Sequence, residues 1–282
     1  MEIGVKTFQT RNKVLTKNNI KELSIQVNLN GLSFCILNRT SNTIEFLNSI
    51  SFHHKLNPFD VLNRLKTELS ANSVFSDEFD SITVVHQNEL STLVPKALYD
   101  ENNKADYLKF NTKILKTDYI THDDITVNDS VNVYIPYINI NNYIYETFGE
   151  FTYKHSSTVL VDTLLQKKHQ SDSIDVYLHV NSNTIEIAVI DKQQLQLFNT
   201  FEYHSKEDFI YYVLFVFEQL SLDVETTVIY LSGVINQDDE LYSLLYTYIR
   251  HVEFEKMNFT YTFSEKIDTK RLHQYYLILN TF

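Results

Sequence analysis

Glycine is scarce in this sequence. The 282 residues include only four glycines, at positions 4, 31, 149 and 233. Loops that enclose a nucleotide phosphate use glycine, because its missing side chain lets backbone N–H groups approach the ligand. Gly4 lies in the N-terminal tail, and Gly149 follows a segment with helical spacing. Two glycines remain for close backbone approaches, so we do not expect a phosphate-binding cradle.

Cysteine and long apolar runs are also missing. The single cysteine, Cys35, excludes an internal disulfide, which fits a reducing compartment. It alternates with neighbours in a strand pattern, so we expect it to be buried and unreactive. The longest apolar runs, such as residues 211–217, are too short to span a bilayer. The N-terminus lacks the apolar core of a secretory signal. We therefore expect a cytoplasmic protein with no transmembrane segment.

Positive charge is limited and unevenly distributed. The net charge is −12, whereas nucleic-acid binders need a positive surface to displace counterions, so we expect no DNA partner. Residues 1–21 form a basic N-terminal arm with five basic residues and Glu2, about +4, which leaves about −16 elsewhere. This arm contacts RNA or an acidic partner in one interpretation and is a solvated terminus in the other.

A pattern of three strands, a helix and a strand occurs twice. The short connections make the three strands antiparallel neighbours, and the fourth strand has the apolar run of a strand buried on both faces. Val27 and Val180 occupy the same place in the two copies, an offset of 153 residues. The strands are expected at residues 23–28, 32–38, 44–52 and 81–86, and again at 174–180, 184–190, 195–203 and 226–231. One helix is expected to begin at Pro58 with Asn57 as its N-cap, and another after the N-cap Ser205.

The duplication predicts an α/β protein of two domains, each a mixed five-stranded sheet with helices. We place the first domain at residues 22–170 and the second at residues 171–282. Between the copies we expect a strand at 131–138, a helix at 139–148 ended by Gly149, a strand at 150–154 and a helix at 156–168. In the second domain Asn236 is expected to cap a helix that carries Arg250 and His251 in its last turn.

Three segments carry a resemblance to a known fold. They are LSIQVNLNGLSFCI (23–36), STLVPKALY (91–99) and NNYIYETFGEFTYKHSSTVL (141–160). With the order of elements, they resemble the duplicated, ribonuclease H-like fold shared by actin, sugar kinases and the bacterial proteins FtsA and PilM. The sequence is most similar to an uncharacterised family of Bacteroidota with that fold, a domain of unknown function.

The resemblance implies an ATP site between the domains, but its motifs are degenerate. Active members carry Asp-x-Gly in the first hairpin of each domain, and paired glycines in the adenosine loop. The corresponding segments here are Gln26-Val27-Asn28, His179-Val180-Asn181 and a loop with the single glycine Gly233. We therefore expect Gln26, Asn28, His179, Asn181 and Gly233 to mark degenerate nucleotide loops, with no cofactor, metal or catalytic residue.

Three other clusters carry possible chemistry. His53-His54 are adjacent in an expected strand, so they point to opposite faces and do not share a metal. The His122-Asp123-Asp124 segment offers metal-ligand types without a second cluster at a defined spacing. Ser232-Gly233 follows a strand, as a nucleophile elbow does, but lacks the G-x-S-x-G frame.

Three functions compete. The first is a non-catalytic actin-like module, a pseudo-enzyme that binds another protein. Its 19 tyrosines and 19 phenylalanines suit a protein-binding face. The second is an ATP-binding kinase or ATPase whose acids are supplied from elsewhere, such as Asp191, Asp223 or Glu225. The third is a cytoplasmic platform like PilM or FtsA. We expect a protein partner, and the oligomeric state stays open.

Overall fold

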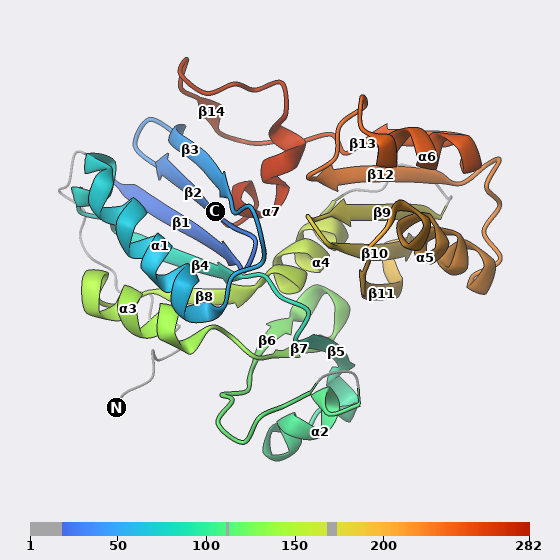
Figure 1. Cartoon of the computed structure of the whole chain (residues 1–282), viewed down its shortest axis with the longest axis horizontal. Helices are drawn as coiled ribbons and strands as arrows, with labels where there is room; N and C mark the ends of the chain where they lie inside the picture. Colours follow the sequence, from blue (N-terminus) through green and yellow to red (C-terminus); the bar gives the residue numbers. More distant parts are fainter. Residues whose placement is uncertain (1–18, 111–112, 168–173) are drawn as a thin grey trace.

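Two β-sheets lie side by side and are joined by helices at the centre of the molecule (Figure 1). This computed structural model describes residues 19–110, 113–167 and 174–282. The expected domain boundary near residue 170 and most of the basic arm, residues 1–18, lie outside the described residues. Lys21 of that arm is the first residue of a strand.

The first half contains a six-stranded sheet in the order β14-β3-β2-β1-β4-β8. Asn57 caps α1, because its side chain accepts hydrogen bonds from the backbone N–H groups of Phe59 and Asp60. Gly149 ends α3 with a φ of 84°, as expected. The elements are β1 (Lys21–Asn28), β2 (Gly31–Asn38), β3 (Thr43–Ser51), α1 (Pro58–Ala71), β4 (Ser81–His86), α3 (Ile138–Phe148), β8 (Thr152–His155) and α4 (Ser156–Gln166).

A three-stranded sheet is inserted between β4 and α3. Its order is β5-β7-β6, with β5 (Ser91–Pro95), α2 (Lys104–Leu108), β6 (Thr121–Ile125) and β7 (Ser130–Tyr134). The strand expected at 131–138 is shorter and ends before Pro136, which cannot donate to a ladder. Strand β6 lies in a polar stretch where the pattern predicts no strand. There Asp123 is buried and hydrogen-bonded rather than exposed.

The second half repeats the arrangement with a five-stranded sheet in the order β11-β10-β9-β12-β13. Ser205 caps α5 as expected, accepting a hydrogen bond from the backbone N–H of Asp208. The elements are β9 (Asp175–Val180), β10 (Thr184–Asp191), β11 (Gln194–Glu202), α5 (Lys206–Gln219), β12 (Val228–Gly233), α6 (Glu240–Tyr248) and β13 (His251–Phe254).

The two halves share their strand register as well as their order. Val27 of β1 pairs with Leu32 of β2, and Val180 of β9 pairs with Ile185 of β10, residues that are each 153 positions apart between the copies. The register shift of the next ladder lies between Ile36 and Leu37 in the first half and between Val189 and Ile190 in the second, again 153 positions apart. This agreement shows that the two halves repeat one arrangement, as the duplication predicts.

The C-terminal segment departs from the simple repeat. Strand β14 (Thr262–Phe263) pairs with β3, so the first sheet has six strands rather than the five expected. Helix α7 (Tyr276–Leu279) packs between the halves (Figure 1), where Ile278 and Leu279 cover Cys35. Cys35 is fully buried, as predicted, and desolvation raises the pKa of its thiol.

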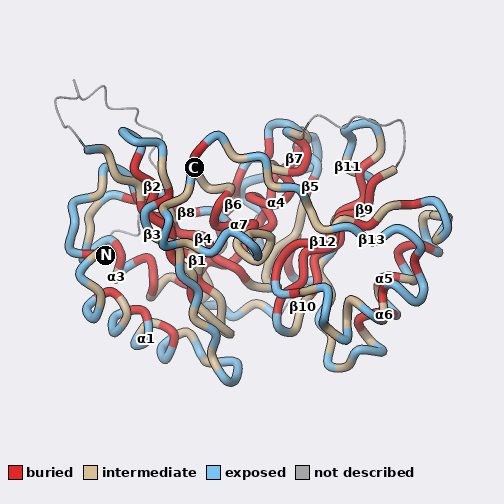
Figure 2. Tube along the Cα trace, turned by 90° about the horizontal axis from the view of Figure 1, so that it is seen from above, coloured by how far each residue is buried: buried red, intermediate tan, exposed pale blue. Residues whose placement is uncertain are grey.

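Buried residues follow the strands and the inner faces of the helices in both halves (Figure 2). Leu23, Phe34 and Leu65 belong to the core of the first half, and Val180, Phe209 and Leu245 to the core of the second. A third cluster, which includes Leu160 of α4 and Ala188 of β10, joins the two halves. In the described part of the chain, none of the helices has the length and apolar character needed to cross a membrane.

Candidate functional site

The five positions predicted from the degenerate loops lie together. Gln26, Asn28, His179, Asn181 and Gly233 all line one pocket between the halves, with a volume of 90 Å³. They converge because β1, β9 and β12 end at this cleft, and β12 runs parallel to β9 with Gly233 opposite Val180. The five positions therefore lie where the two halves meet.

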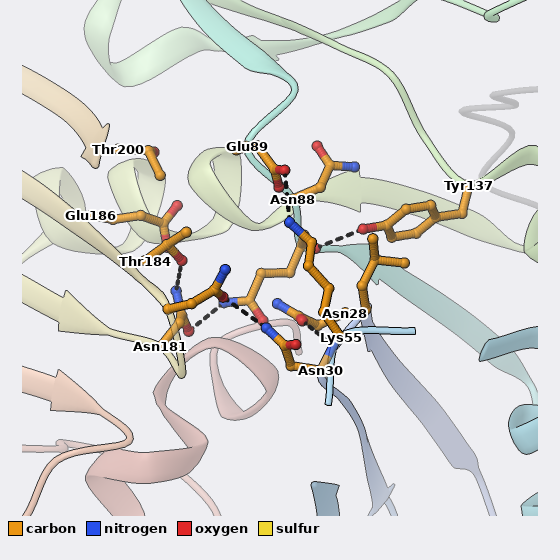
Figure 3. Close-up of a pocket in the computed structure, with 13 residues that line it drawn as sticks. Asn28, Asn30, Lys55, Asn88, Glu89, Tyr137, Asn181, Thr184, Glu186 and Thr200 are labelled. Carbon is orange, nitrogen blue, oxygen red and sulfur yellow. Dashed lines mark hydrogen bonds and ion pairs between the residues drawn. The ribbon is translucent and has the colours of Figure 1, made fainter. Parts of the chain in front are cut away.

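A second cavity adjoins the first. Its volume is 10 Å³, and it is lined by residues of both halves, including Asn30, Lys55, Glu89, Asn181 and Glu186 (Figure 3). Pockets that bind small molecules measure about 300–1,000 Å³, so both cavities are far smaller than a nucleotide site. A volume of 10 Å³ is close to the space that one water molecule needs.

Amide side chains join the halves across the cleft. Gln26 Nε2 donates to Gln87 Oε1 at 2.8 Å, and Gln87 Nε2 donates to Asn181 Oδ1 at 2.7 Å. Separately, Asn30 Nδ2 donates to Asn183 Oδ1 at 2.7 Å. We call these three bonds the amide bridge. Because Gln87 and Asn181 are buried, the bridge satisfies polar groups that would be costly to leave without partners.

Amides outnumber carboxylates at the cleft. Of the described residues that line the two cavities, eight carry amides and two carry carboxylates. The amides are Gln26, Asn28, Asn30, Gln87, Asn88, Asn181, Asn183 and Gln274. One carboxylate, Glu89, accepts from Lys55 Nζ at 3.1 Å (Figure 3). Neutral amides bind Mg²⁺ less well than carboxylates do, so this lining does not suit a magnesium nucleotide.

Glu186 is one of the site residues that the sequence reasoning missed, together with Gln87, Asn183 and Lys55. Glu186 is 2% exposed, and its Oε1 accepts a hydrogen bond from Ser157 Oγ at 2.9 Å. Burial raises its pKa to about 7, while hydrogen bonds from Ser157 and Asn181 act in the opposite direction. In the sequence Glu186 alternates with Ile185 and Ile187, which predicts a solvent-facing side chain. Helix α4 covers that face instead.

His179 contacts Ser232, the residue that the sequence analysis considered as a nucleophile. Its Nδ1 lies 2.9 Å from Ser232 Oγ, and both side chains are buried. Burial lowers the pKa of His179 to about 4, so the imidazole is neutral at physiological pH. Ser232 does not line either cavity. The Ser232–His179 pair therefore lacks the access to a substrate that a nucleophile and its base require.

Position 233 requires glycine because the backbone of Val180 lies too close for a side chain. A Cβ atom at this position would lie 2.1 Å from the backbone oxygen of Val180, and the φ of Gly233 is +85°. The next residue, Val234, donates its N–H to that same oxygen at 2.7 Å. Gly233 thus serves a backbone contact within the sheet.

The structure does not bring the alternative acids to the cleft. Asp191 ends β10 and pairs with Gln194 at the strand end opposite Thr184, which lines the cleft. Asp223 and Glu225 are exposed in the loop before β12, where Asp223 Oδ1 accepts from the N–H of Glu225. This loop lies at the start of β12, whereas the end of β12 reaches the cleft. These three acids therefore lie away from the cleft.

The candidate metal ligands are also dispersed. His53 and His54 lie in an exposed bend after β3 and not in the strand as expected, because β3 ends at Ser51. Asp124 is exposed and pairs with Lys96. Asp123 Oδ2 accepts from the N–H of His155 and from Thr158 Oγ1, both at 2.8 Å. Asp123 therefore organises the start of α4. No group of three His, Cys, Asp or Glu side chains suited to a metal occurs among the described residues.

Two duplicated halves whose strands end at a shared cleft define an actin-like ATPase fold. Within that class, the chain belongs to a family described as a protein of unknown function (DUF3822), whose model matches residues 10–252. The comparison with curated proteins gave no match.

Two solved structures show the same fold. A Bacteroides thetaiotaomicron protein, described as having an actin-like ATPase fold and unknown function, matches with a TM-score of 0.72 and 24% identity. The match covers 85% of this chain and 92% of that one. A chain of the PilM-PilN type IV pilus biogenesis complex matches with a TM-score of 0.60 and 10% identity, covering 92% and 95% of the two chains. Identities this low show the fold alone.

Proposed function

We propose that this protein is a non-catalytic member of the actin-like ATPase fold that acts by binding another protein. The amide bridge carries this proposal. In relatives that use ATP, the resemblance places metal-organising acids and phosphate-binding glycines at the ends of the first hairpins. Here Gln26 donates to Gln87 within the first half, and Gln87 donates to Asn181 of the second half across the cleft. The side chains of this chain thus occupy the volume that a nucleotide would need.

Electrostatics support the same proposal. Magnesium ATP brings several negative charges, and a site for it supplies backbone donors together with carboxylates for the metal. The cleft offers neutral amides, a neutral His179 and a Glu186 that is buried against Ser157. A buried carboxylate without a metal repels a phosphate. Lys55, the one lysine or arginine among the described residues that line the two cavities, is already paired with Glu89.

The fold of PilM is compatible with protein binding but does not identify the partner here. The solved structure that contains PilM is, by its description, a complex with PilN. A similar role as a platform for an assembly is a narrower form of the proposal, and it rests on likeness of fold alone.

Calorimetric titration with Mg-ATP, together with a phosphate-release assay, tests the proposal. We expect no binding in the micromolar range and no hydrolysis. Micromolar binding that Gln26→Ala or His179→Ala abolishes, while exposed Asn63→Ala leaves it intact, would overturn the proposal in favour of an ATP-binding kinase or ATPase.

A further inference from the structure

Strand β11 forms an outer edge of the second sheet. Among the strands of the described residues it pairs with β10 alone. The N–H of Tyr203 donates to the carbonyl of Asn183, which fixes the alternation along this ladder. The backbone N–H and C=O groups of Phe198, Thr200 and Glu202 therefore point away from β10. They form a row of hydrogen-bonding groups along the open edge.

This edge has few of the features that normally block strand addition. Soluble proteins protect sheet edges with lysine, proline, short strands, bulges or covering segments. Strand β11 is nine residues long and contains no lysine, arginine or proline. Its pairing with β10 has one register irregularity, between Val189 and Ile190 of β10. The N–H of Thr200 is turned to the side chain of Asn199. In the first half the corresponding edge strand, β3, is covered at its start by β14.

The surroundings of β11 are strongly acidic. Residues 174–254 contain thirteen Asp and Glu residues and three Lys and Arg residues, a net charge of −10 out of −12 for the whole chain. Glu202 ends β11, and Glu207 lies in the first turn of α5. Lys206, beside them, is paired with Glu240. The acidic second halves of two copies of this chain would repel each other. The charge therefore favours a basic partner over a second copy.

Aromatic side chains lie beside the same edge. Phe201 of β11 stacks on Tyr212 of α5 with ring centroids 4.8 Å apart. On the outer face of α5, Tyr211 is 60% exposed and Phe215 is 39% exposed, and their rings are also stacked. Aromatic faces next to carboxylates attract lysine and arginine side chains, because ring quadrupole and charge act in the same direction. They also give an apolar surface for alternate side chains of an added strand.

We propose that β11 is a docking edge for an extended segment of a partner protein, in which apolar residues alternate with lysine or arginine. The segment adds to the sheet as a sixth strand through the outward backbone groups of Phe198, Thr200 and Glu202. Its basic side chains face the acidic second half. This inference rests on the proposed binding function and specifies where the partner binds and what its chemistry is.

A defined peptide tests the edge on the full-length protein. The probe is the acetylated and amidated peptide Lys-Val-Lys-Val-Lys-Val-Lys, with binding followed by isothermal titration calorimetry and protection of the β11 amides by hydrogen exchange. We expect saturable binding that protects Phe198, Thr200 and Glu202. Two control peptides complete the set: one with every backbone nitrogen methylated, which keeps the charge but has no N–H donor on either edge for the ladder, and one with Glu in place of Lys. Neither is expected to bind.

Matched protein variants separate strand addition from general charge attraction. Gln194→Lys/Gln196→Lys adds two charges at exposed positions of β11, and we expect it to weaken peptide binding about tenfold or more. Asn48→Lys/Asn63→Lys adds the same charge at exposed positions of the first half and is expected to change the affinity less than about twofold. Circular dichroism confirms that both variants are folded.

Three results would overturn the edge proposal. They are equal binding of the N-methylated peptide, undiminished binding by Gln194→Lys/Gln196→Lys, or no binding of the probe up to about 1 mM. A dimer that sedimentation detects and that Gln194→Lys/Gln196→Lys dissociates would assign the edge to a second copy instead. Mg-ATP calorimetry on the same preparation separates the two proposals, because ATP binding with normal peptide binding overturns only the non-catalytic function.

Discussion

Asn30 and Asn183 occupy equivalent positions in the two halves and are hydrogen-bonded to each other, from Nδ2 of Asn30 to Oδ1 of Asn183 at 2.7 Å. They are 153 residues apart, the same offset that relates Val27 to Val180. Each follows the first strand of its half, in the turn to the second strand. The duplication therefore places like residues against each other at the cleft, where the fold in its active relatives separates the two hairpins by a nucleotide.

The first prediction concerns this pair. Asn30→Ala and Asn183→Ala each remove one side of a partly buried hydrogen bond, and each is expected to lower the free energy of unfolding by about 0.5–1.5 kcal/mol. The double variant is expected to lose less than the sum of the two, because both single changes break the same bond. Urea denaturation measures all three. Strict additivity, with exposed Asn48→Ala as the neutral reference, would show that the bond contributes nothing.

Gln87 is the central residue of the amide bridge. Its replacement is therefore expected to lower the free energy of unfolding more than the replacement of Asn30 or Asn183. It is buried, and it accepts from Gln26 and donates to Asn181. Gln87→Ala leaves both partners without their bonds and is expected to lower the free energy of unfolding by about 2–3 kcal/mol. We also expect faster hydrogen exchange at the ends of β1 and β9. Gln274→Ala, at the rim of the same pocket, is the comparison. Equal losses for the two variants would contradict a special role for Gln87.

The local pattern of the sequence predicts the repeated strands well, because alternation and turn residues are local signals. Strands β1 to β4 and β9 to β12 begin and end within a few residues of the expected positions. Helix α6 is less well predicted. Asn236 does not cap it, since Asp239 precedes its first residue and accepts from the N–H of Asn236. Arg250 follows the helix and His251 begins β13, because parallel pairing with β12 takes over there.

Contacts between distant segments explain what the pattern could not predict. Asp123 is buried in β6 only because Tyr134, His155 and Thr158 supply donors from other elements. Glu186 is buried only because α4 covers β10. The return of the C-terminal segment to β3 depends on a two-residue pairing that has no periodicity to detect. The predicted site positions lie close together because they stand at strand ends, whose positions the topology fixes. The amide bridge could not be predicted, because it depends on Gln87 and on the directions in which the side chains point.

Two glycines with similar φ angles give a test of packing. Gly233→Ala places a Cβ 2.1 Å from the Val180 oxygen at a φ of +85°, and we expect a loss of about 3 kcal/mol or more in unfolding free energy. Gly149 has a φ of +84° but open space around the added atom. Gly149→Ala is therefore expected to cost less than Gly233→Ala, about 1–3 kcal/mol, which is the conformational penalty alone. Thermal denaturation of both variants measures the difference. Similar losses would mean that the contact with Val180 relaxes freely.

The thiol of Cys35 is expected to be inert in the native protein. It is fully buried beneath Ile278 and Leu279, and burial raises its pKa, so neither access nor thiolate is available. A colorimetric thiol reagent is expected to react only after the protein unfolds, at a rate that increases with denaturant. Leu279→Ala opens the cover and is expected to speed the reaction, whereas Leu98→Ala, at an exposed site in the insertion, leaves it unchanged. Rapid modification of the unaltered native protein would contradict the buried position.

Glu186 predicts a specific dependence of stability on pH. Its pKa is raised from 4.5 to about 7, so the folded protein favours the neutral carboxyl. The contribution of the neutral Glu186 carboxyl to the stability of the fold is fully present below about pH 4.5 and is lost as the pH rises through 7. His155 and His179 act in the opposite direction. Burial lowers their pKa values to about 3 and about 4, so stability is lost as the pH falls from 6.5 through those values.

Glu186→Gln separates the pH effect of the Glu186 carboxyl from the effects of His155 and His179, because it removes only the carboxyl titration. The variant keeps an acceptor for Ser157 and places a neutral group between α4 and β10 permanently. We expect it to match the unaltered protein at pH 5 and to be more stable by roughly 2–3 kcal/mol at pH 8, where the buried carboxylate of the original is ionised. Denaturation from pH 4 to 9 measures the difference, with exposed Glu218→Gln as the matched control. A constant difference across that range would mean that Glu186 stays ionised in the fold, and that Ser157 and Asn181 stabilise its charge.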